Sequence, residues 1–166
     1  RELITSLILN VRSISSAFNV AEKLTSLADQ DAQAVSALKD EQERQELLAL
    51  LGIREGERVS PSLRAQVRRL EEQQKRRAKR VSSDTLLRSV AQVQTVLRDA
   101  LAVALSAQAP LVNEHLREPL EAFCTRRSAQ QLLEDVQAVE LTLRRLRTNA
   151  NARLALEALM SRFVYQ

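Results

Sequence analysis

A short polar break separates two helix-forming runs in residues 144–163, RRLRTNANARLALEALMSRF. Asparagine caps helices well, because its side-chain oxygen accepts hydrogen bonds from the free backbone N–H groups of the first turn. It also tolerates the left-handed conformation that ends a preceding helix. Asn149 and Asn151 are therefore expected to end one helix and start the next, which predicts a tight helical hairpin.

The composition on either side of this hairpin is that of a helical protein. The 166 residues include two glycines and three prolines, and aromatic residues make up 2%. Residues with high helix propensity dominate, and β-branched or aromatic runs bounded by turn signals are missing. We therefore expect an all-α fold, a bundle of about five to seven helices with one long exposed basic helix.

Apolar residues at helical spacing predict the core. Ser128 is expected to cap a helix with a heptad seam, and a second stripe precedes it. The heptad seam consists of Leu132, Val136, Val139, Leu143 and Leu146. The preceding stripe consists of Leu86, Val90, Val93, Leu97 and Leu101, and it is widened by Ala100, Ala104 and Leu105. The inward face of the last helix consists of Leu156, Leu159, Met160 and Phe163. Residues 106–110 are expected to connect helices, and Pro119 to break or begin one.

The N-terminal third predicts a further helical segment. Residues 1–9 are expected to form a short apolar helix or lead-in, and Ser13, Ser15 or Ser16 can cap the helix that follows. Its predicted inward positions are Val20, Leu24, Leu27, Val35, Leu38, Leu48 and Leu51. Gly52 is expected to end this helix, residues 53–59 to form a loop, and Ser60 with Pro61 to begin the next helix.

A single domain over residues 1–166 accommodates these elements. It divides into N-terminal helices (1–53), a loop with a basic helical segment (54–83) and a C-terminal helical bundle (84–166), where Asp84 after two serines is expected to start a new helix. Because the chain begins with Arg1 rather than Met, we interpret it as a domain of a longer protein. We expect no membrane span or signal peptide, and the single cysteine fits a reducing cytoplasm.

Positive charge is concentrated in one segment. Residues 64–80 hold eight cationic and two acidic residues, a net charge of +6, so the rest of the chain sums to −2 of the total +4. The candidate phosphate contacts are Lys75, Arg76, Arg77, Lys79 and Arg80. The alternative is an exposed helix that serves only solubility. No aromatic residue is interleaved, which disfavours base stacking with single strands.

Residues that could carry catalysis are scarce. Neither glycine belongs to a phosphate-binding loop, and His115 stands alone, so we expect no metal, no cofactor and no small-molecule substrate. Cys124 would need a nearby histidine to act as a nucleophile, and a buried apolar role fits it better. Glu121, Glu134 and Asp135 are adequately explained as solvated helix positions.

Residues 75–163 resemble a known family. The sequence elements are LRDAL at 97–101, LVN at 111–113 and NANARLALEAL at 149–159. They are similar to the C-terminal domain of the delta-prime subunit of the bacterial DNA polymerase III clamp loader. KRRAKR at 75–80 resembles the high-GC Gram-positive branch of that family.

The resemblance implies an assembly role. Domains of this type pack side by side in a ring of five subunits, the collar, which holds the ATPase modules together while the sliding clamp is placed on DNA. The implied partners are the gamma/tau ATPase and delta subunits, met through heterologous contacts in the cytoplasm. The fragment itself would be no enzyme, although its parent assembly is the DNA polymerase III holoenzyme.

Five residues are candidate partner contacts: Arg98, Asp99, Phe163, Val164 and Tyr165. Arg98 and Asp99 form either a buried or interface pair or an ordinary exposed pair. A different class of function remains open, a stand-alone helical nucleic-acid-binding or adaptor protein that acts through residues 64–80.

Overall fold

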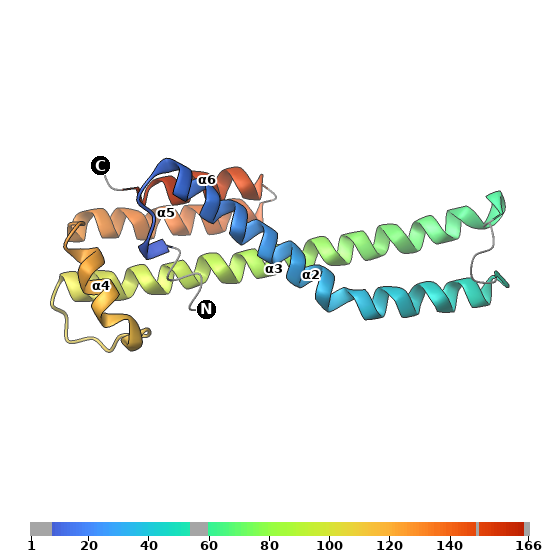
Figure 1. Ribbon diagram of the computed structural model, residues 1–166, viewed down its shortest axis with the longest axis horizontal. Helices are drawn as coiled ribbons and strands as arrows, with labels where there is room; N and C mark the ends of the chain where they lie inside the picture. The colour runs from blue at the N-terminus through green and yellow to red at the C-terminus, as the bar shows by residue number, and fades with distance from the viewer. Residues whose placement is uncertain (1–7, 54–59, 149, 165–166) are drawn as a thin grey trace. The chain divides into compact units, whose positions relative to one another are not determined.

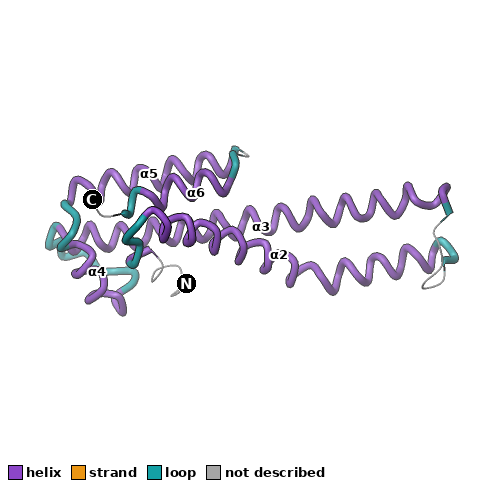
Figure 2. Tube along the Cα trace, turned by 45° about the horizontal axis from the view of Figure 1, so that its top comes forward, coloured by secondary structure: helices purple, strands orange, loops and turns teal. Residues whose placement is uncertain are grey.

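The computed structural model describes residues 8–53, 60–148 and 150–164, where every regular element is helical (Figure 2). The elements are α2 (Ile14–Leu50), α3 (Pro61–Ala104), the 3₁₀ helix η1 (Glu114–Leu116), α4 (Arg117–Cys124), α5 (Ala129–Arg147) and α6 (Ala152–Ser161). The predicted all-α class is confirmed.

The chain divides into two compact units. Unit 1 comprises Arg1–Ser26 with Leu86–Gln166, and unit 2 comprises Leu27–Thr85. The first part of α2 and the last part of α3 belong to unit 1, together with α4, α5 and α6. Unit 2 contains the remaining parts of α2 and α3, which run side by side (Figure 1).

Large apolar side chains fill unit 1. Its fully buried residues include Leu97, Leu120, Leu132, Leu156, Leu159, Met160, Val90, Val93, Val96 and Val139. These come from α3, α4, α5 and α6, and α5 lies against α6 (Figure 1). Both predicted stripes therefore line this core. Ala104 and Leu105 are exposed instead, because α3 ends there.

Side-chain caps fix the helix starts in unit 1. Ser128 and Gln131 form a capping box at the start of α5, and the Asn151 side chain accepts a hydrogen bond from the Leu154 N–H at the start of α6. At the start of α2, the Ser13 hydroxyl accepts from Ser16 N–H and the Ser16 hydroxyl accepts from Ser13 N–H. The predicted capping roles of Ser128 and Asn151 are confirmed, whereas Asn149 lies outside the described residues.

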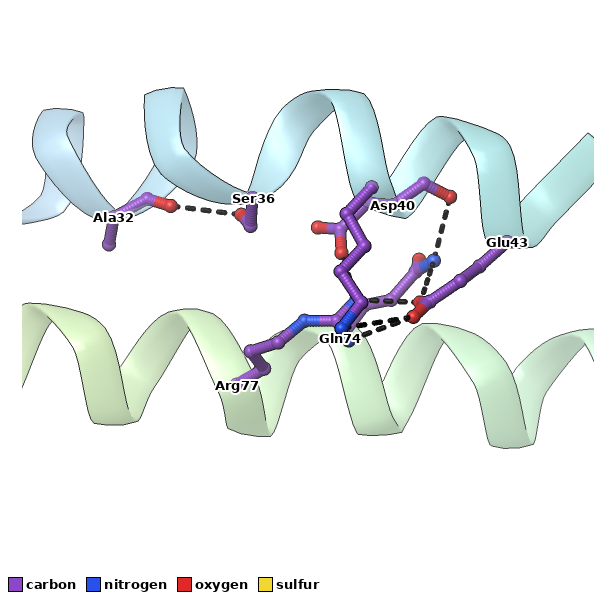
Figure 3. Close-up of polar contacts among 7 residues, drawn as sticks. Ala32, Ser36, Asp40, Glu43, Gln74 and Arg77 are labelled. Carbon is purple, nitrogen blue, oxygen red and sulfur yellow. Dashed lines mark hydrogen bonds and ion pairs between the residues drawn. The ribbon is translucent and has the colours of Figure 1, made fainter.

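Small residues line the helix contact in unit 2. The buried positions of α2 in this unit are Ala28, Ala32 and Ser36, spaced by four, which leaves room for a close helix neighbour. Val35 and Leu38 are 72% and 81% exposed, so the prediction that they point inward is wrong. Ala32 and Ser36 lie on the face toward α3 (Figure 3), whereas Val35 and Leu38 point to solvent.

α3 passes through the two serines at 82–83 without a break, so the predicted helix start at Asp84 is wrong. The Ser82 hydroxyl donates to Asp29 of α2 over 2.6 Å, so this serine connects the two helices and does not end α3. The predicted start at Pro61 is confirmed. Residues 1–7 of the lead-in and 54–59 of the predicted loop lie outside the described residues.

Both long helices end in the same hydrogen-bonding motif. After α2, Ile53 N–H donates to Leu48 O and Gly52 N–H to Ala49 O, with Gly52 at φ +68°. After α3, Ala107 N–H donates to Ala102 O and Ser106 N–H to Val103 O, with Ser106 at φ +50°. These are Schellman motifs, which usually place glycine at the left-handed position. The C-terminal role predicted for Gly52 is confirmed.

Candidate functional sites

A buried carboxylate ties the end of α3 to the connector that follows it. Asp99 is completely buried and accepts hydrogen bonds from the backbone N–H groups of Val112 (3.1 Å) and Asn113 (2.7 Å). The Asn113 side-chain amide donates to the same carboxylate over 2.8 Å. The sequence elements LRDAL and LVN therefore meet in space, and Asp99 fixes the fold of the connector.

Arg98 differs from its neighbour in exposure. Its guanidinium donates to Asp99 over 3.0 Å and to Pro110 O over 3.2 Å, while its side chain stays 47% exposed. Asp99 is therefore buried, as in the first alternative raised by the sequence, whereas Arg98 is exposed, as in the second. Arg98 is available to a partner, whereas Asp99 has its hydrogen-bonding capacity used inside unit 1.

A second buried carboxylate was missed by the sequence interpretation. Asp135 was expected to be solvated, yet it is 2% exposed and contacts Arg127 over 2.6 Å and Arg162 over 3.4 Å. The Arg127 guanidinium also lies 5.2 and 5.6 Å from the ring centres of Phe123 and Phe163. Burial raises the pKa of Asp135, and the two arginines partly oppose this effect.

The candidate partner contacts at the C-terminus differ in exposure. Phe163 is only 2% exposed, so the expectation that it offers an apolar surface to a neighbour is wrong, because it packs into unit 1 beside Arg127. Val164 is half-buried. Tyr165 lies outside the described residues.

The side chain of Arg77 in unit 2 extends toward Glu43 of α2 (Figure 3). Its guanidinium donates to both carboxylate oxygens of Glu43, over 2.9 and 2.6 Å, and pairs with Asp40. Gln74 donates to the Asp40 backbone carbonyl over 2.9 Å. The hydrogen bond from Arg77 lowers the pKa of Glu43. The expectation that Arg77 is an exposed phosphate contact is therefore wrong.

Lys75, Arg76, Lys79 and Arg80 are exposed. Within the described residues, none of the four makes an ion pair or a side-chain hydrogen bond. Four of the five candidate phosphate contacts thus present unpaired charge to solvent.

The candidates for catalysis show no constellation in the described part of the chain. His115 is exposed in η1, and the Cys124 thiol donates to Ala100 O over 3.1 Å, with its pKa raised by burial. No group of three or more metal-binding side chains in residues 8–53, 60–148 and 150–164 is arranged around a common point. None of the helices described there has the length and apolarity of a membrane span.

A family model described as the C-terminal part of the DNA polymerase III delta subunit matches residues 82–164, which is half of the chain. The chain belongs to this family. The family is a non-catalytic clamp-loader domain, and it suggests interaction with other clamp-loader subunits. No curated protein and no solved structure matches the chain.

The clamp-loader family match lies almost entirely in unit 1. It includes Asp99 and Asn113, which carry the hydrogen bonds between LRDAL and LVN, and Asn151, which caps α6. Residues 27–81 of unit 2, with Arg77 and the exposed cations, fall outside it. The family therefore covers the C-terminal part of unit 1, and it leaves residues 1–26 and the helical pair of unit 2 unassigned.

Proposed function

We propose that the chain is the subunit-assembly domain of a clamp-loader delta-prime subunit of the high-GC Gram-positive type, and that it supports the loading of sliding clamps during DNA replication in the cytoplasm. Its partners would be the gamma/tau ATPase and delta subunits, arranged in a heterologous ring. The family match at residues 82–164 supports the clamp-loader part of this proposal.

The observation that carries the proposal is the hydrogen-bonded link from Asp99 to the backbone of Val112 and Asn113. It holds two of the sequence elements that resemble delta-prime in one rigid piece of structure. An assembly domain needs such rigidity, because a flexible surface would lose conformational entropy on each subunit contact.

The same link presents a surface suited to a protein partner. Val112 is 63% exposed and Leu105 60% exposed, close in sequence to the partly exposed Arg98. The core of a protein interface is more apolar than the rest of the surface, and arginine is enriched there. We therefore place the neighbour contact at Arg98, Val112 and Leu105, and Asp99 positions the first two through its hydrogen bonds.

Native mass spectrometry tests this proposal. The chain would be mixed with the collar region of the clamp-loader ATPase subunit from the same source, and a defined hetero-complex is expected. Arg98→Glu and Val112→Asp should weaken the complex at least tenfold, since hot-spot residues each contribute about 2 kcal/mol or more.

A matched control is Arg147→Glu, which changes an exposed arginine at the end of α5 and should leave the complex intact. The absence of any complex with the wild-type chain would overturn the assembly role. Unchanged binding by both surface variants would overturn the placement of the contact.

A further inference from the structure

Five of the cations of α3 in unit 2 lie on one side of the helix. Residues three or four positions apart lie on the same side of a helix, and positions 68, 72, 75, 76, 79 and 80 follow that spacing. Five of the six are cationic and exposed: Arg68, Lys75, Arg76, Lys79 and Arg80. We call these five residues the basic face of α3. Glu72 is the acidic residue among the six positions, which together carry a net charge of +4.

The opposite side of α3 is occupied. Leu70, Gln74, Arg77 and Val81 are half-buried, and Gln74 and Arg77 bond to α2. The contact with α2 therefore fixes the rotation of α3 and directs the basic face to solvent. Arg76 and Arg77 are neighbours in sequence, yet one is exposed and the other is paired with Asp40 and Glu43.

The free charges point to an anionic partner. No member of the basic face has an ion pair or a side-chain hydrogen bond within the described residues. Arg68 and Arg80 at the ends of the basic face are twelve helical steps apart, which is ~18 Å of helix axis. Duplex DNA rises ~3.4 Å per base pair, so this length corresponds to ~5 base pairs of backbone.

The side chains around the basic face narrow the choice of partner. Residues 27–85 contain no aromatic residue, so the base stacking that holds single strands is missing. Membrane-surface helices insert an apolar face, and among the described residues of α3 in unit 2 no large apolar side chain is exposed. Rows of cations without base-reading or apolar groups are typical of contacts to the phosphates of a duplex.

We propose that the basic face of α3 binds the phosphate backbone of double-stranded DNA without sequence preference. This inference rests on unit 2, outside the family match, and goes beyond the assembly role proposed for unit 1. Arg77 has no part in the binding, because its guanidinium is held by Asp40 and Glu43.

The test uses the full chain and a fluorescently labelled DNA duplex of about 20 base pairs, with affinity measured by anisotropy from about 50 to about 200 mM salt. Five phosphate contacts predict a slope of about −4.5 in log affinity against log salt concentration. The triple variant R76Q/K79Q/R80Q should reduce the slope to about −2 and weaken binding at least about tenfold.

Two controls isolate the basic face. R144Q/R145Q/R147Q removes the same number of exposed charges from the end of α5 in unit 1 and should leave the slope unchanged. R76Q should lower the slope magnitude by about 0.9, whereas R77Q should not, provided that circular dichroism shows both to be folded. Glu72→Gln should tighten binding, since it removes the acidic residue from the face.

Three results would overturn the proposal: equal loss of affinity in the two triple variants, an affinity independent of salt, or binding to anionic lipid vesicles or to oligo(dT) in preference to the duplex. The R76Q/K79Q/R80Q variant should still form the complex expected from the assembly role. The failure of one proposal is therefore distinguishable from the failure of the other.

Discussion

Units 1 and 2 each contain an arginine bound to carboxylates, but in different surroundings. In unit 1, the side chains of Arg127 and Asp135 are 10% and 3% exposed and lie among large apolar residues. In unit 2, those of Arg77, Asp40 and Glu43 are 25–32% exposed, and the buried apolar residues among those described there are Ala28 and Ala32. Breaking the two ion pairs should therefore change the free energy of unfolding by different amounts. Water screens the pair in unit 2 and hardly reaches the pair in unit 1.

The largest expected effect comes from breaking the pair in unit 1. Asp135→Ala leaves the Arg127 guanidinium buried without its carboxylate partner, which should lower the free energy of unfolding by about 3–5 kcal/mol. Urea denaturation followed by circular dichroism measures this change.

Glu134→Ala is the matched control, because Glu134 is adjacent but exposed and should change stability by less than about 0.5 kcal/mol. Equal effects of the two variants would contradict the distinction between a buried and a surface carboxylate.

Enlarging a small residue tests the close helix contact of unit 2. Ala32 is 2% exposed, so Ala32→Leu should overpack the contact and lower the free energy of unfolding by about 1–3 kcal/mol. Ala37→Leu makes the same change at an exposed position of α2 and should be close to neutral. If Ala32→Leu were stabilising in urea denaturation, the face toward α3 would be loosely packed rather than close.

Charge reversal tests whether the ion pairs of Arg77 stabilise the helical pair of unit 2. Arg77→Glu places a third carboxylate beside Asp40 and Glu43 and should destabilise the helical pair, though less than Asp135→Ala destabilises unit 1. Adding Glu43→Arg restores an opposite charge and should recover part of the loss. Thermal unfolding of the single and double variants gives the coupling, and additive effects would show that the two side chains do not interact.

One carboxylate in each unit should contribute to the pH dependence of stability with opposite sign. The pKa of Glu43 is lowered from 4.5, so its contribution to stability is present above that value and is lost as the pH falls through its folded pKa. The pKa of Asp135 is raised from 3.8, so the folded state holds its proton more tightly, and that contribution is lost as the pH rises from 3.8 through the folded value.

Carboxyl ¹³C titration by NMR measures both groups in one sample, with Glu43→Gln and Asp135→Asn as assignment controls. Glu43 is expected to titrate below 4.5 and Asp135 above 3.8. A depressed value for Asp135 would mean that its arginine partners outweigh its burial.

The smallest effects concern the two Schellman motifs. Ser106 has a side chain at a left-handed φ, so Ser106→Gly should stabilise the protein by about 0.5–1 kcal/mol. The reverse change, Gly52→Ser, should cost about 1 kcal/mol, because a Cβ there meets open space and only the backbone strain remains. Thermal denaturation of the two variants should give shifts of opposite sign.

The two units also differ in how much of them the sequence predicts. The stripes of α3 and α5 in unit 1 repeat large apolar residues, so the core and the caps at Ser128 and Asn151 follow from local rules. Unit 2 continues a heptad spacing after Leu70 through Gln74, Arg77 and Val81, but two of these inward positions are polar. Apolar periodicity cannot detect that contact, because Gln74 and Arg77 are held by hydrogen bonds to α2.

Asp135 carried a detectable signal. It stands three residues after Leu132 and four before Val139, within the apolar stripe of α5, where a charged residue needs a partner. The identity of that partner was beyond the sequence, because Arg127 and Arg162 reach it through the packing of α4, α5 and α6. Among the site candidates, the exposure of four basic residues was predictable, and the inward turn of Arg77 was not.

The half-buried thiol of Cys124 gives unit 1 a built-in reporter of its own opening. It is the only cysteine of the chain, its Sγ donates to Ala100 O of α3, and burial raises its pKa. Because alkylating reagents attack the thiolate, labelling of the native protein near neutral pH should wait for α4 to separate from α3. The rate of a simple alkylation reaction would then report how often α4 separates from α3 in the isolated chain. The same reaction can be run on any complex that the chain forms.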